Sequence, residues 1–152
     1  MSGPETTYYR SIVKLLPDVY SEKMSNPYSS GTPDLWFSGR NDDLWLEVKY
    51  LVLPKRGHTM VDFDLSARQQ LWLRNRHAEG RSTGVLIGSP EGGLLLLNLD
   101  WEVTFPAEDF RLHAVAKDVI ASRIRHITGT SPCKQSSANS SRQLRVSRPS
   151  TG

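Results

Sequence analysis

The sequence GTPDLWFSGRNDDLWLEVKY, residues 31–50, sets two acids and a lysine inside a pair of apolar segments. The segments DLWF and LWLEVKYLVL are joined by SGRNDD, and this pattern predicts a β-hairpin. Because side chains alternate between the two faces of a strand, Glu47 and Lys49 share a face with Trp45, and the alternate positions form an apolar face. The second strand is therefore expected to present an acid and a base opposite a core-facing side.

A carboxylate at the edge of a buried sheet is costly unless something compensates its charge. Asp34 begins the first strand and Glu47 lies on its hairpin partner, so the two are expected to converge and to raise each other's pKa. A divalent cation removes both penalties. Mg²⁺ prefers oxygen ligands, and the backbone carbonyl of Val48 would supply a third. Lys49, roughly 6–7 Å beyond Glu47, is positioned to hold an attacking water or to stabilise charge on a phosphate.

The turn before Asp34 has two interpretations. Gly31 permits a positive φ or a close approach to a ligand, and Pro33 holds Thr32 extended, so that Asp34 follows a stiff lead-in. The same residues are common in ordinary turns, and taken alone that explanation is the stronger one.

Residues before the hairpin predict an amphipathic helix that begins after Pro4 and ends before Pro17. Its apolar stripe consists of Tyr8, Tyr9, Ile12, Val13 and Leu16. Glu5 extends this stripe instead of opposing it, which suggests a functional acid, although the helix dipole alone favours an acid in a first turn. The polar stretch YSEKMSNPYSSGTP that follows supports no secure strand.

Downstream, residues 65–80 predict a helix with Ser66 or Asp64 as its N-cap, Trp72 and Leu73 on its inner face and Gly80 as its stop. The apolar runs TGVLIG and LLLLNL, joined by SPEGG, predict a second hairpin. Residues 107–129 predict one closing helix ending at Gly129. Its expected apolar stripe is Leu112, Val115, Ala116, Val119, Ile120 and Ile124.

Composition places these elements in one domain, residues 1–129, since 152 residues with 38% hydrophobic content suffice for one core. Residues 130–152 contain four basic residues and no acid, a charge of +4, whereas residues 1–129 carry 15 basic and 16 acidic residues. This Ser-rich tail is expected to be disordered, and either attracts phosphate backbones or has no role. The sequence shows no membrane span and no signal peptide, so we expect a cytoplasmic protein.

The motif Pro33-Asp34 followed by Glu47-Val48-Lys49 resembles the signature of the PD-(D/E)XK nuclease superfamily. GTPDLW is similar to the Gly-x-Pro-Asp-Leu of the virus-type replication-repair nucleases, the VRR-NUC family. LSARQQLWL, which contains Gln69, resembles that family's Ser-x-x-Gln helix. The resemblance covers most of residues 5–99 and departs from the family in the longer segment LVLPKRGHTMVDFD.

The resemblance implies an α/β fold with a restriction-endonuclease-like core, a mixed central sheet flanked by helices in the order αβββαβ. It implies that Asp34 and Glu47 bind Mg²⁺, for which Mn²⁺ substitutes, and that Glu5 assists directly or through water. Lys49 would act on the nucleophile, and Gln69 would orient Lys49 or a phosphate.

The implied activity is metal-dependent hydrolysis of DNA, selective for branched structures such as Holliday junctions, in replication, recombination or repair. Family members include phage enzymes, which act in the host cytoplasm, and homodimers. Two alternatives stay open: a catalytically inactive nuclease-fold module that binds DNA, and a sequence-specific restriction-type endonuclease. The loop with Lys55, Arg56 and His58 is either a DNA contact or a solvated surface loop.

Overall fold

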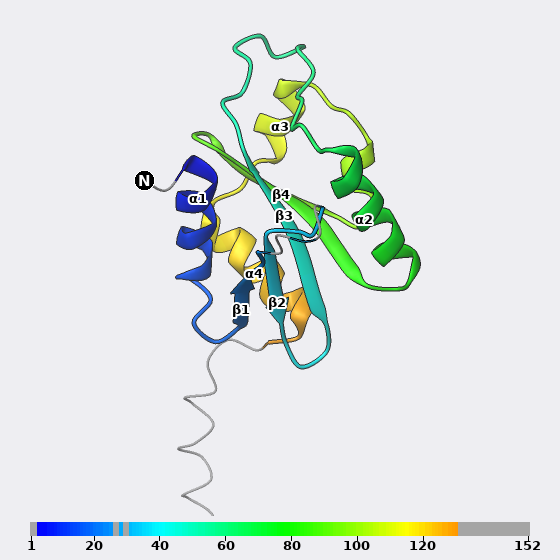
Figure 1. The fold of residues 1–152 in the computed structure, drawn as a ribbon. Helices are drawn as coiled ribbons and strands as arrows, with labels where there is room; N and C mark the ends of the chain where they lie inside the picture. Colours follow the sequence, from blue (N-terminus) through cyan, green and yellow to red (C-terminus); the bar gives the residue numbers. More distant parts are fainter. Residues whose placement is uncertain (1–2, 26–27, 29–30, 131–152) are drawn as a thin grey trace, which may run out of the picture.

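The computed structural model describes residues 3–25, 28 and 31–130, which form a five-stranded mixed sheet flanked by helices (Figure 1). The strands are β1 (Tyr20–Lys23), β2 (Leu35–Ser38), β3 (Asp43–Tyr50), β4 (Ser82–Ser89) and β5 (Gly92–Leu97). The helices are α1 (Pro4–Val13), α2 (Ala67–Ala78), α3 (Ala107–His113) and α4 (Lys117–Thr128), with a 3₁₀ turn η1 at Asp100–Glu102. The order α1–β1–β2–β3–α2–β4 confirms the expected αβββαβ arrangement.

The strands lie in sequence order across the sheet. β3 and β4 are parallel and are connected through α2, whereas the other neighbouring strands are antiparallel. α1 and α4 cover one face of the sheet, and α2 and α3 cover the other (Figure 1). Each face has its own apolar cluster; β4 contributes to both clusters, whereas β3 contributes only to the cluster beneath α1 and α4.

The expected hairpin is confirmed as β2 and β3, with Leu35 opposite Leu46 and Trp36 opposite Trp45. Leu44 and Leu46 are fully buried beneath α1 and α4, as the alternation predicts. The second strand ends at Tyr50 rather than continuing to residue 53. The face that carries Glu47 is turned towards α2.

β1 lies within the polar stretch for which the sequence supports no strand. Its sequence YSEK has no apolar alternation, and three of its four side chains are exposed. The strand exists because its backbone pairs with β2, where Ser21 is opposite Phe37 and Lys23 is opposite Leu35. Main-chain pairing at a sheet edge leaves little trace in side-chain composition.

The single closing helix predicted for residues 107–129 is wrong, because the structure divides it into α3 and α4. Ala114 and Ala116 are extended, and Val115 exchanges two backbone hydrogen bonds of 2.9 Å with Gly93. This pairing with β5 replaces helical hydrogen bonds at the break. Leu112, expected in the core, is 78% exposed in consequence. The predicted stop at Gly129 is confirmed by its left-handed φ of 73°.

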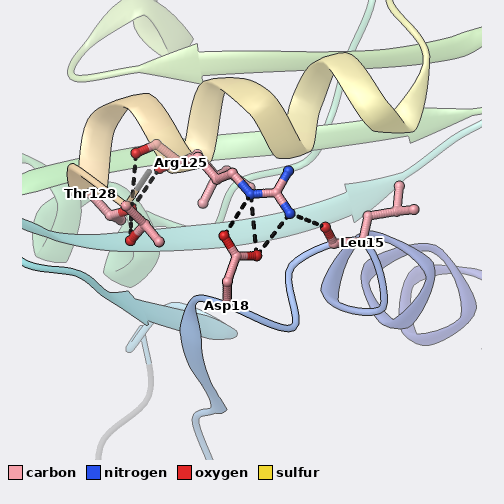
Figure 2. Close-up of polar contacts among 6 residues, drawn as sticks. Leu15, Asp18, Arg125 and Thr128 are labelled. Atoms are coloured by element: carbon pink, nitrogen blue, oxygen red, sulfur yellow. Dashed lines mark hydrogen bonds and ion pairs between the residues drawn. The ribbon is translucent and has the colours of Figure 1, made fainter. Parts of the chain in front are cut away.

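A salt bridge fixes the chain after α1 to α4 (Figure 2). The Arg125 guanidinium donates to both carboxylate oxygens of Asp18, at 2.8–3.2 Å, and to the carbonyl of Leu15 at 2.7 Å. Hydrogen bonds from Arg125 hold the pKa of Asp18 below its usual value. The bridge therefore joins the end of the helix that carries Glu5 to the body of the domain.

Asp18→Asn should lower the free energy of unfolding at pH 7 by about 1 kcal/mol or less, because the bridge lies at the surface. A carboxylate whose pKa is lowered by folding stabilises the folded protein at pH values above its pKa in the unfolded chain. This contribution is lost as the pH falls through its pKa in the folded protein. The difference from wild type should therefore vanish in acid. Denaturant unfolding between pH 2 and pH 7 checks this, with the exposed Asp100→Asn as control. A difference that persists at low pH would contradict the assignment.

Candidate metal site

Asp34, at the entry to β2, reaches across to β3. Its Oδ2 accepts a hydrogen bond of 2.9 Å from the backbone N–H of Val48, between Glu47 and Lys49. Its backbone carbonyl accepts from the N–H of Met24 at 2.8 Å, which continues the pairing of β1 with β2. The expected convergence of Asp34 on the β3 motif is therefore present, and backbone contacts on both sides fix its position.

Glu47 is the buried acid of the site, with only 3% of its surface exposed. Its Oε1 accepts a hydrogen bond of 2.6 Å from Gln69 Nε2 and lies 3.8 Å from Lys49 Nζ. Its Oε2 is buried and accepts no hydrogen bond from the described residues. Burial first, and the charge of Asp34 second, raise the pKa of Glu47 to about 8, although the charge of Lys49 opposes this shift. A side-chain hydrogen bond with Asp34, which the protonated carboxyl of Glu47 can donate, adds to the rise in pKa.

The unpaired Oε2 of Glu47 is the observation on which the fit of a metal ion to this site can be judged. Buried polar atoms in proteins are almost always paired, and an unpaired one costs free energy. Oxygen donors from Glu47 and Asp34, with the nearby carbonyl of Val48, form the ligand set that hard divalent cations prefer. These residues fit a Mg²⁺ or Mn²⁺ ion, which would satisfy Oε2 and the paired negative charges together.

Glu5 stands apart from this pair. Within the described residues, no group of three or more His, Cys, Asp or Glu side chains is placed to hold a metal ion. The charge of Glu5 nevertheless makes the smallest of the contributions to the raised pKa of Glu47, so the two carboxyl groups interact electrostatically. The expected assistance of Glu5, directly or through water, stays a prediction.

Gln69 is held by the cap of α2. Ser66 is the N-cap, as expected, and Asp64, the alternative, lies outside the helix with a positive φ. Ser66 Oγ accepts from the backbone N–H of Gln69, and Gln69 Oε1 accepts from the backbone N–H of Ser66 at 2.9 Å. This capping box occupies the amide oxygen, so the amide nitrogen faces Glu47. Gln69 thus contacts Glu47 in the structure, whereas the sequence suggested Lys49 or a phosphate.

Gly31 has the positive φ that the sequence allowed, at 102°. A Cβ at this position would lie 2.7 Å from the carbonyl oxygen of Arg68, in the first turn of α2. The close approach is therefore to α2, and it brings the lead-in to Asp34 against the turn that carries Gln69.

A row of aromatic rings lies beside the site, and sequence reasoning identified only Trp45 of its members. Trp36 and Trp45 stack with ring centroids 5.5 Å apart, Trp72 lies 5.6 Å from Trp45, and Tyr20 lies 5.5 Å from Trp36. Trp45 is two positions before Glu47 on β3, and Trp72 is three positions after Gln69 on α2. The row therefore starts next to the acid. Strand alternation places Trp45 on this face, but the contribution of the edge strand depends on the unforeseen β1.

The loop after β3, which contains Gly57 and Thr59, is hydrogen-bonded to α3. Backbone carbonyls of Gly57 and Thr59 accept hydrogen bonds of 2.8 and 2.9 Å from the first N–H groups of α3, and so cap that helix. Lys55, Arg56 and His58 are exposed on the loop, and their contact with DNA stays a prediction.

Compared by sequence, the chain matches no protein-family model and no curated protein. Its structure is similar to that of Hjc, a Holliday junction resolvase from the archaeal hyperthermophile Archaeoglobus fulgidus. The TM-score is 0.52 at 16% sequence identity, and the match covers 76% of this chain and 98% of the resolvase chain. The likeness confirms the restriction-endonuclease-like fold, a five-stranded mixed sheet flanked by helices. At this identity it is evidence for fold alone.

No helix in the described part of the chain has both the length and the apolar character needed to cross a membrane. The predicted disordered tail, apart from Thr130, lies outside the described residues.

Proposed function

We propose that this protein is a metal-dependent endonuclease that hydrolyses phosphodiester bonds in DNA. The observation that supports the proposal is the buried Oε2 of Glu47, unpaired among the described residues, with Asp34 and Lys49 beside it. A structural acid would be expected to satisfy both oxygens or to lie in solvent. A buried acid with one oxygen that accepts no hydrogen bond, next to a second acid, supports a site for a cation.

The residues of the chain would divide the work as follows. Asp34 and Glu47, with the carbonyl of Val48, would hold Mg²⁺ or Mn²⁺. The bound ion would supply Lewis-acid stabilisation of the phosphate and a more acidic water. Gln69 keeps the Glu47 carboxylate in place through its 2.6 Å hydrogen bond. Lys49, with 18% of its side chain exposed, is accessible to a phosphate or a water on the solvent side of Glu47.

Branched DNA is the proposed substrate, because the fold resembles a Holliday junction resolvase. The GTPDLW and LSARQQLWL segments support a relationship to the VRR-NUC nucleases. A homodimer is part of the proposal, since one site cuts one strand and symmetric cleavage of a junction needs two.

Cleavage of a matched substrate panel tests the proposal. Single-stranded, duplex, flap and four-way junction DNA of shared sequence would be incubated with the full chain in Mg²⁺, Mn²⁺ or EDTA. We expect metal-dependent cutting that is fastest on a branched substrate and absent in EDTA. Binding to all four without cutting in either metal would favour the inactive module instead, and cutting at one sequence irrespective of structure would favour the restriction-type alternative.

Lys49→Met should lower the cleavage rate by about a hundredfold or more, because it removes the cation nearest the reacting phosphate. The acids remain, so Mg²⁺ affinity measured by calorimetry should be kept. The pKa of Glu47 should rise further, since the charge of Lys49 lowers it. The exposed Lys14→Met serves as the control for a lost surface charge. A loss of Mg²⁺ affinity in Lys49→Met that matches the loss of rate would contradict the proposed role.

A further inference from the structure

A pocket of about 840 Å³ lies outside the acidic site. It is lined by the first turns of α1 and α4, the end of β3 and the β4–β5 turn. Tyr8 and Tyr50 form an aromatic wall with ring centroids 5.9 Å apart, and Lys117 lies at the start of α4. None of these residues takes part in the chemistry proposed above.

Tyr8 lines this pocket and buries its hydroxyl group against Gly93 at a cost. The residue is 5% exposed, and its hydroxyl is buried without a hydrogen-bond partner among the described residues. Its ring fits because two strand positions are glycines. A Cβ on Gly88 would lie 2.6 Å from the ring, and a Cβ on Gly93 would collide with the hydroxyl itself. Phenylalanine would fill the same space without an unpaired polar atom, so packing alone does not explain the tyrosine.

The start of α4 adds donors to the same pocket. The N-cap Ala116 has no side-chain cap, and the first bonded N–H groups, those of Val119 and Ile120, both donate to its carbonyl. The N–H groups of Lys117 and Asp118 are therefore not used within the helix. Asp118 balances the charge of Lys117, and the helix dipole adds about half a positive charge at this end. Lys117 Nζ lies 5.8 Å from the centre of the Tyr8 ring, so its charge is next to the hydroxyl-bearing ring.

We propose that this pocket binds a phosphate group of a nucleotide, which accepts hydrogen bonds from the Tyr8 hydroxyl and the first N–H groups of α4. The ring of Tyr50 would lie against the attached sugar or base. Helix N-termini with free N–H groups bind phosphates well, and here a buried, unpaired donor lies against Gly93, which lines the same pocket. Burial raises the pKa of Tyr8 to about 12, so the hydroxyl keeps the proton that it would donate.

The position of the pocket connects it to the acidic site. Tyr8 and Glu5 are one helical turn apart on α1, and Glu5 acts electrostatically on Glu47. Tyr50 directly follows Lys49 on β3, and because successive strand residues point to opposite faces, its ring packs on the α1–α4 face whereas Lys49 lies on the α2 face. The identity of the ligand as DNA rests on the proposed function, and the pocket would then hold a phosphate away from the one that is cut. Binding in this pocket needs neither cleavage nor a metal ion.

Tyr8→Phe tests the inference, because it removes one oxygen atom and nothing else. In the free protein the substitution removes an unpaired buried group, so the midpoint of thermal unfolding should stay level or rise by about 3 °C. DNA affinity, measured by fluorescence anisotropy in EDTA, should fall about tenfold, or about 1.4 kcal/mol. Stability and affinity would thus change in opposite directions. Tyr9→Phe, on the same helix but outside the pocket, should leave DNA affinity unchanged.

Two further measurements make the outcome decisive. Inorganic phosphate and thymidine monophosphate, each added alone, should raise the unfolding midpoint of wild type more than that of Tyr8→Phe. A larger effect of the mononucleotide would indicate that the ring contacts contribute, and Lys117→Met should weaken both effects. Unchanged DNA affinity in Tyr8→Phe, or no DNA binding by wild type in EDTA, would overturn the inference.

The two proposals fail separately. A wild-type protein that binds DNA through Tyr8 but cuts no substrate would refute the endonuclease and leave the phosphate pocket standing. If the wild-type protein cuts DNA and Tyr8→Phe binds DNA with unchanged affinity, the phosphate pocket would be refuted and the endonuclease would stand.

Discussion

Glu47→Gln should abolish cleavage and at the same time stabilise the protein. The amide keeps the shape of the side chain but cannot replace a carboxylate as a ligand for Mg²⁺. Losing several kcal/mol of transition-state stabilisation corresponds to a rate roughly a thousandfold lower. Stability should change the other way, because the wild-type protein buries a carboxyl group whose Oε2 has no partner among the described residues and which lies near Asp34.

The gain in stability should depend on pH in a defined direction. The pKa of Glu47 rises from 4.5 to about 8 on folding, so the native state binds more protons than the unfolded state between these values. Wild-type stability therefore falls as pH rises from 4.5 to 8, by about 1.4 kcal/mol per pH unit at most from this group. Gln does not titrate. The advantage of Glu47→Gln should grow across this window and become constant above it.

Denaturant unfolding in EDTA at several pH values, alongside the substrate panel, measures both effects. Asp100→Asn, an exposed acid without an ion pair among the described residues, is the control for a change in net charge. Cleavage by Glu47→Gln at the wild-type rate would refute the assignment of the site. Equal pH dependence of stability in both proteins would show that the buried carboxyl is not the titrating group.

Asp34→Asn should also abolish cleavage. It should lower the pKa of Glu47, whereas Lys49→Met should raise it. The amide oxygen of Asn can still accept the hydrogen bond from the N–H of Val48, so the β2–β3 geometry should persist. The carboxylate is lost from the metal site, and a rate loss of roughly a thousandfold is expected. Without the charge of Asp34, which raises the pKa of Glu47, that pKa should fall below about 8.

Titration of the glutamate carboxyl carbons by NMR would follow the pKa of Glu47 directly. Asp34→Ala is the companion variant, because it removes the acceptor and should cost about 1 kcal/mol of stability by leaving the N–H of Val48 unpaired. If Asp34→Asn retained cleavage, Asp34 would be only a structural acceptor for β3. An unchanged pKa of Glu47 would show that the two carboxyl groups do not interact.

Secondary structure was predictable wherever side chains carry the pattern. The alternation around Glu47, the stripe that begins at Tyr8 and the capping sequence at Ser66 each produced the expected element. Prediction failed where backbone pairing decides the structure. β1 depends on β2 as its partner, and the break between α3 and α4 depends on the pairing of Val115 with Gly93. Such hydrogen bonds form between main-chain groups that every residue shares, so no side-chain pattern reports them.

The sequence by itself determined which residues are candidates for the site, because Asp34, Glu47 and Lys49 lie within one hairpin whose geometry local rules fix, and its motifs implied the fold class through a family resemblance. Only the tertiary structure decided the state of those residues. The unpaired oxygen and raised pKa of Glu47 depend on burial under α2, and the orientation of Gln69 depends on its cap. The pocket at Tyr8 likewise unites four segments that are distant in sequence. Burial and the convergence of distant segments arise from packing, which short-range sequence patterns do not encode.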